Sequence, residues 1–147
     1  MKIGIASDHK GYKLKEKIKK YLQKENIEFI DYGTDNSKSV DYPDYAFKIG
    51  EEIINKNIDR GILICGSGIG MSIACNKVKG IRCATVRNIE DVKMTRNDNN
   101  ANIIAIGEKT DIKTALKLIE TMVNTSFAGV DRYKRRINKM RDYEESK

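Results

Sequence analysis

A cysteine followed by three evenly spaced glycines is the part of this sequence best suited to chemistry. The stretch Cys65-Gly-Ser-Gly-Ile-Gly70 follows the apolar run Ile62-Leu-Ile64. Glycines let a backbone turn sharply and approach a ligand, and N–H groups at the start of a helix bind anions. A thiol in such a place ionises more readily than a free one. We therefore expect Cys65 to act as a base or nucleophile beside N–H groups that hold an oxyanion, which suits proton abstraction next to a carbonyl. The simpler alternative is that Cys65 is only a buried residue at the end of a strand.

Three familiar glycine loops do not match this stretch. A nucleotide-binding P-loop needs a lysine after its last glycine, and here Met71 follows Gly70. The dinucleotide fingerprint needs two residues between its second and third glycines, whereas Gly68 and Gly70 are separated by one. A phosphatase loop that forms a phosphocysteine needs an arginine at about the position of Met71. These comparisons leave a thiolate beside backbone N–H groups as the preferred interpretation.

The segments around this loop alternate between short apolar strands and amphipathic helices. This alternation predicts a three-layer αβα fold, with one parallel sheet, helices on both of its faces and a further C-terminal helix. We expect a single Rossmann-like domain over residues 1–147 and the strand order 2-1-3-4-5. The strands are expected at 2–6, 27–32, 62–64, 81–86 and 102–107, and the helices from the loop at 7–11 to about 24, at 44–55, after 70, at 89–96, at 111–124 and from about 131 to 145.

In such a sheet, ligands bind where the winding direction reverses, at the carboxyl ends of the strands. Here that point lies between strands one and three. The loop Ser7-Asp8-His9 should therefore face the loop after Cys65 across one crevice, which would bring the only histidine close to the cysteine. We also expect Ser7 or Asp8 to cap the helix that follows.

Composition narrows the classes of protein. No apolar run approaches the roughly 18 residues of a membrane span, and the N-terminal segment does not read as a signal peptide. The three cysteines have neither disulfide nor metal spacing, so we expect a cytoplasmic protein with Cys75 and Cys83 in its core. The net charge of +7 is concentrated in two helical segments, 10–24 and 132–141. The first is expected to be an ordinary amphipathic helix with a solvated lysine face.

Six ordered motifs resemble one known family along nearly the whole chain. They are Ser7-Asp-His-Lys-Gly-Tyr-Lys-Leu-Lys15, Asp41-Tyr-Pro43, Cys65-Gly-Ser-Gly-Ile-Gly70, Asn76-Lys77, Gly80-Ile-Arg82 and Asn99-Asn-Ala-Asn102. The sequence resembles the type B ribose-5-phosphate isomerases, a family that includes galactose-6-phosphate isomerase subunits. The resemblance implies interconversion of an aldose phosphate and a ketose phosphate without a metal or other cofactor. It also implies a homodimer or homotetramer whose sites are shared between subunits.

The resemblance also implies a role for individual residues. Cys65 matches the base that moves a proton between C1 and C2, Ser67 matches a residue beside the sugar, and Gly66 to Gly70 match the anion hole. The implied substrate-binding residues are Asp8, His9, Tyr42, Gly66, Gly68, Ile69, Gly70, Asn99, Lys109, Arg132 and Arg136. Arg132 and Arg136 match a phosphate clamp, and their spacing of four residues places both on one face of a helix.

One motif departs from the family pattern. Where members usually have Arg-Glu-His-Asn, this chain has Arg96-Asn-Asp-Asn99, so Asp98 replaces the histidine that opens the sugar ring. A carboxylic acid kept protonated by burial can perform the same proton transfer. Alternatively, Asp98 only positions the loop, and the ring opens spontaneously or through another residue. The change leaves both five-carbon and six-carbon sugar phosphates open as substrates.

The preferred function is therefore interconversion of ribose 5-phosphate and ribulose 5-phosphate through an enediolate. Two related alternatives are an isomerase of allose 6-phosphate or galactose 6-phosphate and a non-catalytic subunit that binds sugar phosphates. A different class, a nucleic-acid-binding protein that uses the basic last helix, is disfavoured because only Tyr133 interrupts the basic run and no known nucleic-acid module is present. No membrane partner is expected.

Overall fold

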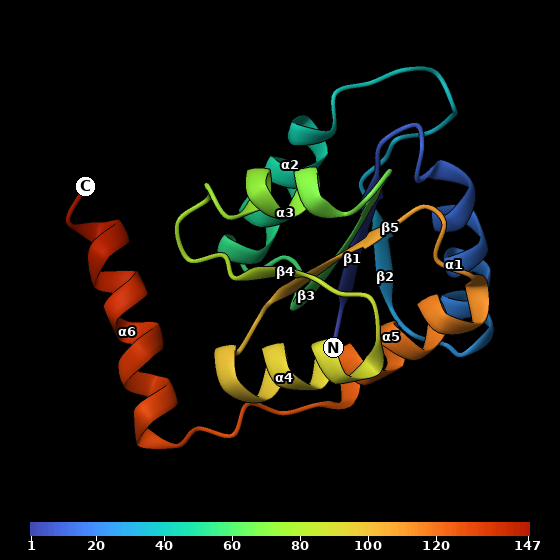
Figure 1. Cartoon of the computed structure of the whole chain (residues 1–147). Coiled ribbons are helices and arrows are strands. Elements are labelled where there is room, and N and C mark those ends of the chain that lie inside the picture. The colour runs from blue at the N-terminus through green and yellow to red at the C-terminus, as the bar shows by residue number, and fades with distance from the viewer.

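The computed structural model describes all 147 residues and contains one five-stranded parallel sheet (Figure 1). Adjacent strands are in register, with Ile5 beside Ile62 and Ile62 beside Ile104. These strands are nearly continuous apolar runs, as expected for a sheet covered on both faces. The strands are β1 (Ile3–Ser7), β2 (Phe29–Asp31), β3 (Arg60–Cys65), β4 (Cys83–Thr85) and β5 (Ile103–Gly107). The predicted parallel αβα fold is confirmed.

The order of the last two strands differs from the prediction. The sheet runs β2-β1-β3-β5-β4, so β5 lies between β3 and β4. The burial of the two strands explains this order. Four of the five residues of β5 are buried, whereas Ala84 and Thr85 in the three-residue β4 are only partly buried. A short, partly exposed strand fits the edge of a sheet better than its centre. The point between β1 and β3 where the winding direction reverses is the same in the predicted and the observed strand orders.

Five helices cover the two faces of the sheet. Helices α1 (Tyr12–Lys24), α4 (Ile89–Asn99) and α5 (Ile112–Asn124) pack on one face around a core that includes Ile18, Val92 and Leu118. Helices α2 (Tyr42–Ile54) and α3 (Ile69–Cys75) pack on the other, around a core that includes Ile49 and Met71. Cys75 and Cys83 lie in this second core, as predicted. None of the helices combines the length and apolar character needed to cross a bilayer.

The last helix, α6 (Asp131–Glu145), stands apart from the rest of the molecule (Figure 1). None of its residues is buried. Its links to the domain include the hydrogen bond from the N–H of Gly80 to Glu144 Oε2 at 3.0 Å. Most of the surface of this helix is therefore free to contact another molecule.

Candidate active site

The turn between β1 and α1 is fixed against the end of β3. The N–H of Asp8 donates to the Ile64 carbonyl at 3.2 Å, and the Asp8 carboxylate accepts from the N–H groups of Lys10 and Gly11, both at 3.0 Å. Gly11 passes so close to β3 that a Cβ on it would lie 2.5 Å from the Ile64 carbonyl oxygen. The expectation that Ser7 or Asp8 caps α1 is wrong, because the N-cap is Gly11. Asp8 instead stabilises the turn that precedes the helix.

A buried ion pair is connected to this turn through hydrogen bonds of Gly33 and Ser7. Lys15 is fully buried, and its Nζ lies 2.6 Å from Asp31 Oδ2, while Lys19 Nζ lies 2.8 Å from the same oxygen. The other oxygen of Asp31 accepts from the N–H of Gly33, whose carbonyl accepts from the N–H of Ser7. Burial acts to raise the pKa of Asp31, but the hydrogen bonds from Lys15 and Lys19 outweigh it and hold that pKa below its ordinary value. The sequence predicted a solvated lysine face for α1. This prediction is wrong for Lys15, which is buried.

Cys65 is the last residue of β3 and is only 5% exposed. The N–H of Gly68 donates to its Sγ at 3.2 Å. Gly68 can do this because it has φ +80°, a conformation that side chains disfavour. Helix α3 begins only at Ile69, whose N–H donates to Ser67 Oγ at 3.2 Å. The glycine loop therefore directs one N–H group at the sulfur of Cys65.

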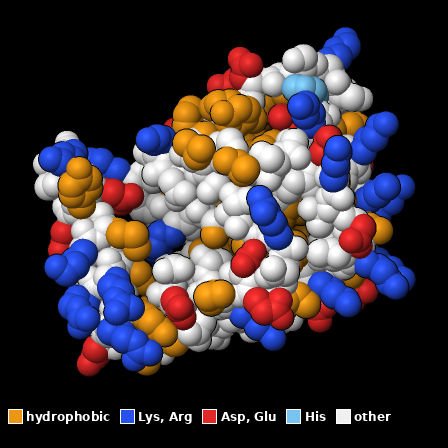
Figure 2. Space-filling model, viewed as in Figure 1, with side chains coloured by type: hydrophobic (Ala, Val, Ile, Leu, Met, Phe, Trp, Pro, Cys, Tyr) orange, Lys and Arg blue, Asp and Glu red, His pale blue; other side chains and the backbone are white.

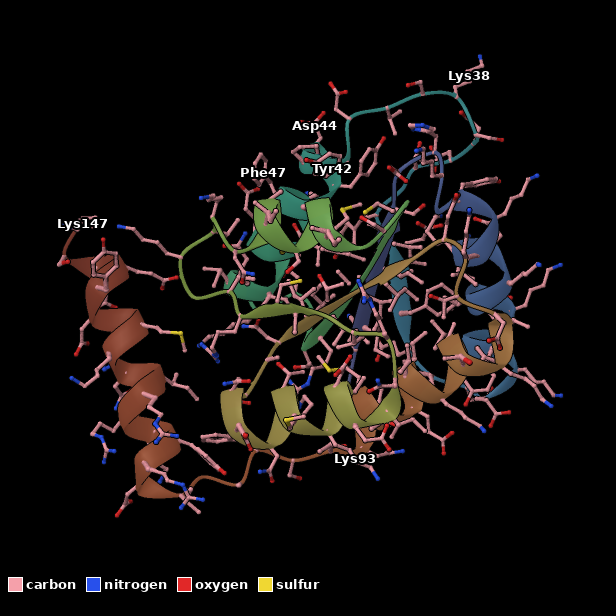
Figure 3. All side chains as sticks on the ribbon, in the orientation of Figure 1. Lys38, Tyr42, Asp44, Phe47, Lys93 and Lys147 are labelled. Carbon is pink, nitrogen blue, oxygen red and sulfur yellow. The ribbon has the colours of Figure 1, made fainter.

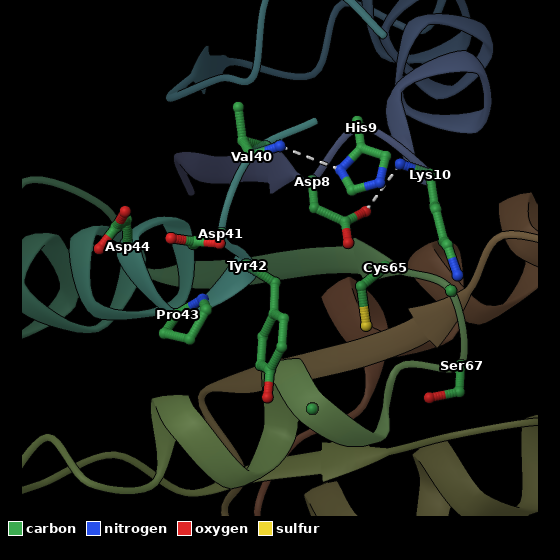
Figure 4. A pocket seen from close by; sticks show the side chains of 12 residues that line it. Asp8, His9, Lys10, Val40, Asp41, Tyr42, Pro43, Asp44, Cys65 and Ser67 are labelled. Carbon is green, nitrogen blue, oxygen red and sulfur yellow. Dashed lines mark hydrogen bonds between the residues drawn. The ribbon is translucent and has the colours of Figure 1, made fainter. Parts of the chain in front are cut away.

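The two loops and the segment 40–44 at the start of α2 line an open cavity of about 670 Å³ (Figure 4). The predicted crevice between the loops that follow β1 and β3 is confirmed. The residues of the sequence prediction that line it are Asp8, His9, Tyr42, Cys65, Gly66, Ser67 and Gly70. Gly70 has no side chain to obstruct Tyr42, since a Cβ there would lie 2.7 Å from the tyrosine ring. Cys65 and the only histidine therefore line one pocket, as a reaction site requires.

His9 has a defined orientation in this crevice. Its Nδ1 accepts the N–H of Val40 at 3.2 Å, so the proton of the neutral ring is on Nε2. His9 is therefore oriented as a hydrogen-bond donor for a bound oxygen.

Asp98 and Asn99 lie elsewhere on the chain. Helix α4 extends to Asn99, three residues beyond the predicted end at Arg96, so both residues lie in its last turn. Asp98 lines a second cavity together with Lys93 and Thr125. Figure 3 shows Lys93 at the opposite end of the molecule from Tyr42 and Asp44, which line the crevice. One chain alone does not bring Asp98 to Cys65.

The predicted phosphate clamp is also separate from the crevice. Arg132 and Arg136 are both exposed on α6, which stands away from the crevice (Figure 1). Arg132 stacks on the ring of Tyr133, with 4.6 Å between the guanidinium carbon and the ring centroid. The clamp therefore faces outward from its own chain.

Two further predicted residues border the glycine loop without lining the crevice. Lys109 lines a neighbouring cavity of about 340 Å³ together with Arg87 and Ser67. The side chain of Ile69 is 47% exposed. Gly68, the remaining predicted glycine, is buried and also does not line the crevice, but its N–H donates to Cys65 Sγ.

Sequence reasoning missed some of the residues that line the crevice. Asp41, Pro43 and Asp44 reach it because α2 begins at Tyr42, two residues earlier than predicted. Pro43 in the first turn of that helix was the available signal. Lys10 also lines the crevice, although it had been grouped with the solvated lysines of α1. No cluster of three or more His, Cys, Asp or Glu side chains is arranged to hold a metal ion.

Known proteins match this chain over almost its full length. Residues 3–140 match the Ribose/Galactose Isomerase family. A candidate sugar phosphate isomerase of Bacillus subtilis is 48% identical over 147 residues, covering 99% of this chain and 98% of the relative. The structure of Clostridium thermocellum ribose-5-phosphate isomerase B has a TM-score of 0.96 and 45% identity, covering 99% of both chains. Ribose-5-phosphate isomerase B of Mycoplasma genitalium, with bound ribulose 5-phosphate, has a TM-score of 0.92 and 34% identity, covering 99% of this chain and 97% of that one. The chain therefore belongs to the ribose/galactose isomerase family of enzymes, which confirms the resemblance to type B ribose-5-phosphate isomerases seen in its motifs.

Proposed function

We propose that this protein interconverts ribose 5-phosphate and ribulose 5-phosphate through an enediolate. The observation that carries the proposal is the placement of Cys65. Its sulfur accepts an N–H from the glycine loop and lines the same crevice as Asp8 and His9. The similar proteins of Clostridium thermocellum and Mycoplasma genitalium are ribose-5-phosphate isomerases, and the second has ribulose 5-phosphate bound.

In the proposed reaction, the Cys65 thiolate removes the proton from C2 of the open-chain aldose. The electron pair of the broken C–H bond forms the C1–C2 double bond of the enediolate, and negative charge develops on O1. N–H groups of the glycine loop and the hydroxyl of Ser67 stabilise that charge. The proton returns from Cys65 to C1, and O2 becomes the ketone oxygen after it loses its own proton to O1. Atoms and charge balance without an external oxidant or reductant.

A second copy of the chain completes the site. It contributes Asp98 and Asn99 from the end of α4, and Arg132 and Arg136 from α6. Two features support this arrangement. Helix α6 buries none of its residues, and hydrophobic side chains gather on the surface over α2 and α3 (Figure 2), where Phe47 and Ile73 are 38% and 60% exposed. An apolar surface of this kind marks an interface.

In this arrangement, Asp98 of the second copy reaches the ring oxygen of the sugar. It takes the place of the histidine usual in the family and donates a proton to that oxygen as the bond between C1 and the ring oxygen breaks. The proton of the O1 hydroxyl passes back to Asp98 as the C1=O1 bond of the open-chain aldose forms. Arg132 and Arg136 bind the phosphate at the far end of the substrate.

The purified protein, assayed by the formation of ketose from ribose 5-phosphate, allose 6-phosphate and galactose 6-phosphate, tests the function. The proposal expects the highest kcat/KM with ribose 5-phosphate. A preference for either six-carbon substrate would contradict the proposed substrate but would leave the proposed aldose–ketose isomerisation standing. No turnover of any of the three, with binding retained, would show a non-catalytic subunit. Light scattering in the same samples tests for the dimer or tetramer.

A further inference from the structure

The crevice has an unusual charge balance for a site that binds a phosphate ester. Three carboxylates line it: Asp8 from the β1–α1 turn, and Asp41 and Asp44 from the start of α2. Among the lining residues, Lys10 is the only lysine or arginine. An enediolate that forms there adds further negative charge. One chain by itself thus provides a single full positive charge to offset the charge of the reacting groups.

The backbone directs Lys10 toward the reactive end of this crevice. Its N–H is held by the Asp8 carboxylate, and the next residue, Gly11, packs against the Ile64 carbonyl. The side chain therefore leaves the turn beside the residues that follow Ile64. A Cβ on Gly66 would lie 3.1 Å from Lys10 Cδ and 3.7 Å from Lys10 Nζ. Figure 4 shows the amino group of Lys10 above the chain between Cys65 and Ser67.

The ammonium of Lys10 also has no carboxylate partner. Lys15 and Lys19 on the following helix form ion pairs with Asp31 at 2.6 and 2.8 Å, whereas Lys10 forms no ion pair within 4.0 Å. An unpaired cation at this position interacts with whatever negative charge appears at the glycine loop. Because Lys10 is exposed, salt screens part of this interaction.

We propose that Lys10 is a further active-site residue, whose ammonium stabilises the negative charge on the Cys65 thiolate and on the enediolate. The role at the enediolate rests on the proposed isomerase function, whereas the role at the thiolate does not. The charged and titratable groups that line the crevice with Cys65 are Asp8, His9, Asp41, Tyr42 and Asp44 in addition to Lys10. Lys10 is the only lysine or arginine among them, so its removal takes away the one full positive charge that the chain places beside a thiolate at Cys65.

Two assays on Lys10→Met, Lys10→Arg and the control Lys13→Met test this proposal. Lys13 is an exposed lysine of α1 that does not line the crevice. The first assay follows alkylation of Cys65 by iodoacetamide as a function of pH, with the modified peptide quantified by mass spectrometry. In Lys10→Met, the pH of half-maximal alkylation should rise by about half a unit to one unit. Lys10→Arg and Lys13→Met should match the wild type. The difference should shrink in 1 M salt, where the Debye length is about 3 Å.

The second assay measures turnover of ribose 5-phosphate. Lys10→Met should lower kcat/KM about tenfold, mainly through kcat, which is less than the loss of a buried oxyanion-hole donor. If Lys10→Met equals Lys13→Met in both assays while the wild type isomerises, the Lys10 proposal is overturned and the proposed function stands. If the alkylation curve shifts but the wild type turns over no sugar phosphate, the isomerase function fails while the role of Lys10 at the thiolate holds.

Discussion

The crevice around Cys65 and the surface formed by the end of α4 and by α6 are built in opposite ways. In the crevice, backbone contacts fix the functional groups: Asp8 to Ile64, and the N–H of Gly68 to the sulfur of Cys65. On the second surface, Arg132 and Arg136 extend from a helix with no buried residue. The crevice is thus assembled by contacts within one chain, whereas Arg132 and Arg136 project from an exposed helix.

In the proposed mechanism, this difference divides proton transfer and phosphate binding between the two regions. Moving a proton requires a base held about 3–3.5 Å from the reacting carbon with little freedom to move, and a rigid sheet edge provides that precision. Binding a phosphate requires charge more than precision, so it can be supplied by a helix that docks from a second copy. The two regions should therefore respond to mutation in different ways.

The largest effect is expected at the base. Cys65→Ala should lower kcat by about 10²- to 10⁴-fold, because the general base is lost. Far-UV circular dichroism and the melting temperature should stay close to wild type, since alanine fits the space of the thiol. Cys75→Ala, a buried cysteine outside the crevice, is the matched control and should keep its activity. Near-normal turnover by Cys65→Ala would remove Cys65 from the mechanism.

The second largest effect is expected on stability, at the buried ion pair between Asp31 and Lys15. Asp31→Asn should lower the free energy of unfolding at pH 7 by about 3 kcal/mol, because the buried Lys15 loses its main partner. Urea unfolding measures this, and Glu16→Gln, which removes the more exposed partner of Lys15, should cost less than about 1 kcal/mol.

The same ion pair predicts a dependence on pH. The folded-state pKa of Asp31 lies below the ordinary value of 3.8, so its contribution is present above that pH and is lost as the pH falls through the lowered pKa. The wild type should therefore lose stability on acidification more steeply than Asp31→Asn. Parallel curves for the two proteins would show that the pair does not stabilise the fold.

A smaller effect is expected on the second surface. Arg132→Ala and Arg136→Ala should each raise KM about tenfold to a hundredfold, because a charge-assisted hydrogen bond contributes about 1.5–3 kcal/mol. Their unfolding free energies should stay within about 0.5 kcal/mol of wild type, since α6 buries nothing. Arg135→Ala on the same helix is the control. If all three variants behave alike, the clamp is assigned to the wrong residues.

The smallest and most selective effect is expected at Asp98. Asp98→Asn should slow the reaction of ribose 5-phosphate about tenfold or more, because ring opening loses its acid. Erythrose 4-phosphate cannot close a ring through its phosphorylated O4, so its turnover should change little. Glu90→Gln, which alters the same cavity, is the control. Equal losses on both substrates would assign Asp98 a positioning role instead.

The sequence predicted the crevice better than the second surface, for physical reasons. Strand type, sheet direction and the reversal between β1 and β3 follow from apolar runs and their alternation with helices. The place of β5 between β3 and β4 does not, because both late strands are short apolar runs and spatial neighbours are set by packing. The end of α4 was missed because Arg96 to Asn100 is polar throughout, and the helix stops only where Asn100 adopts φ +48°.

Individual side chains were harder to predict than elements. Lys10, Lys15 and Lys19 look alike in the sequence, yet one lines the crevice and two pair with Asp31. The different contacts of these lysines depend on the close approach of Gly11 to Ile64 and on the position of β2. Both are properties of the folded chain.

Activity of a mixed dimer tests the central claim most directly. Cys65→Ala chains and chains with both Arg132→Ala and Arg136→Ala are co-expressed with different tags, and the heterodimer is purified. If the arginines of one copy serve the Cys65 crevice of the other, one of the two sites contains only intact residues. The heterodimer should then recover about half of the wild-type activity, while both parent homodimers remain impaired. A heterodimer no more active than its parents would show that Cys65 and the arginines of a single chain act together, and would contradict the shared site.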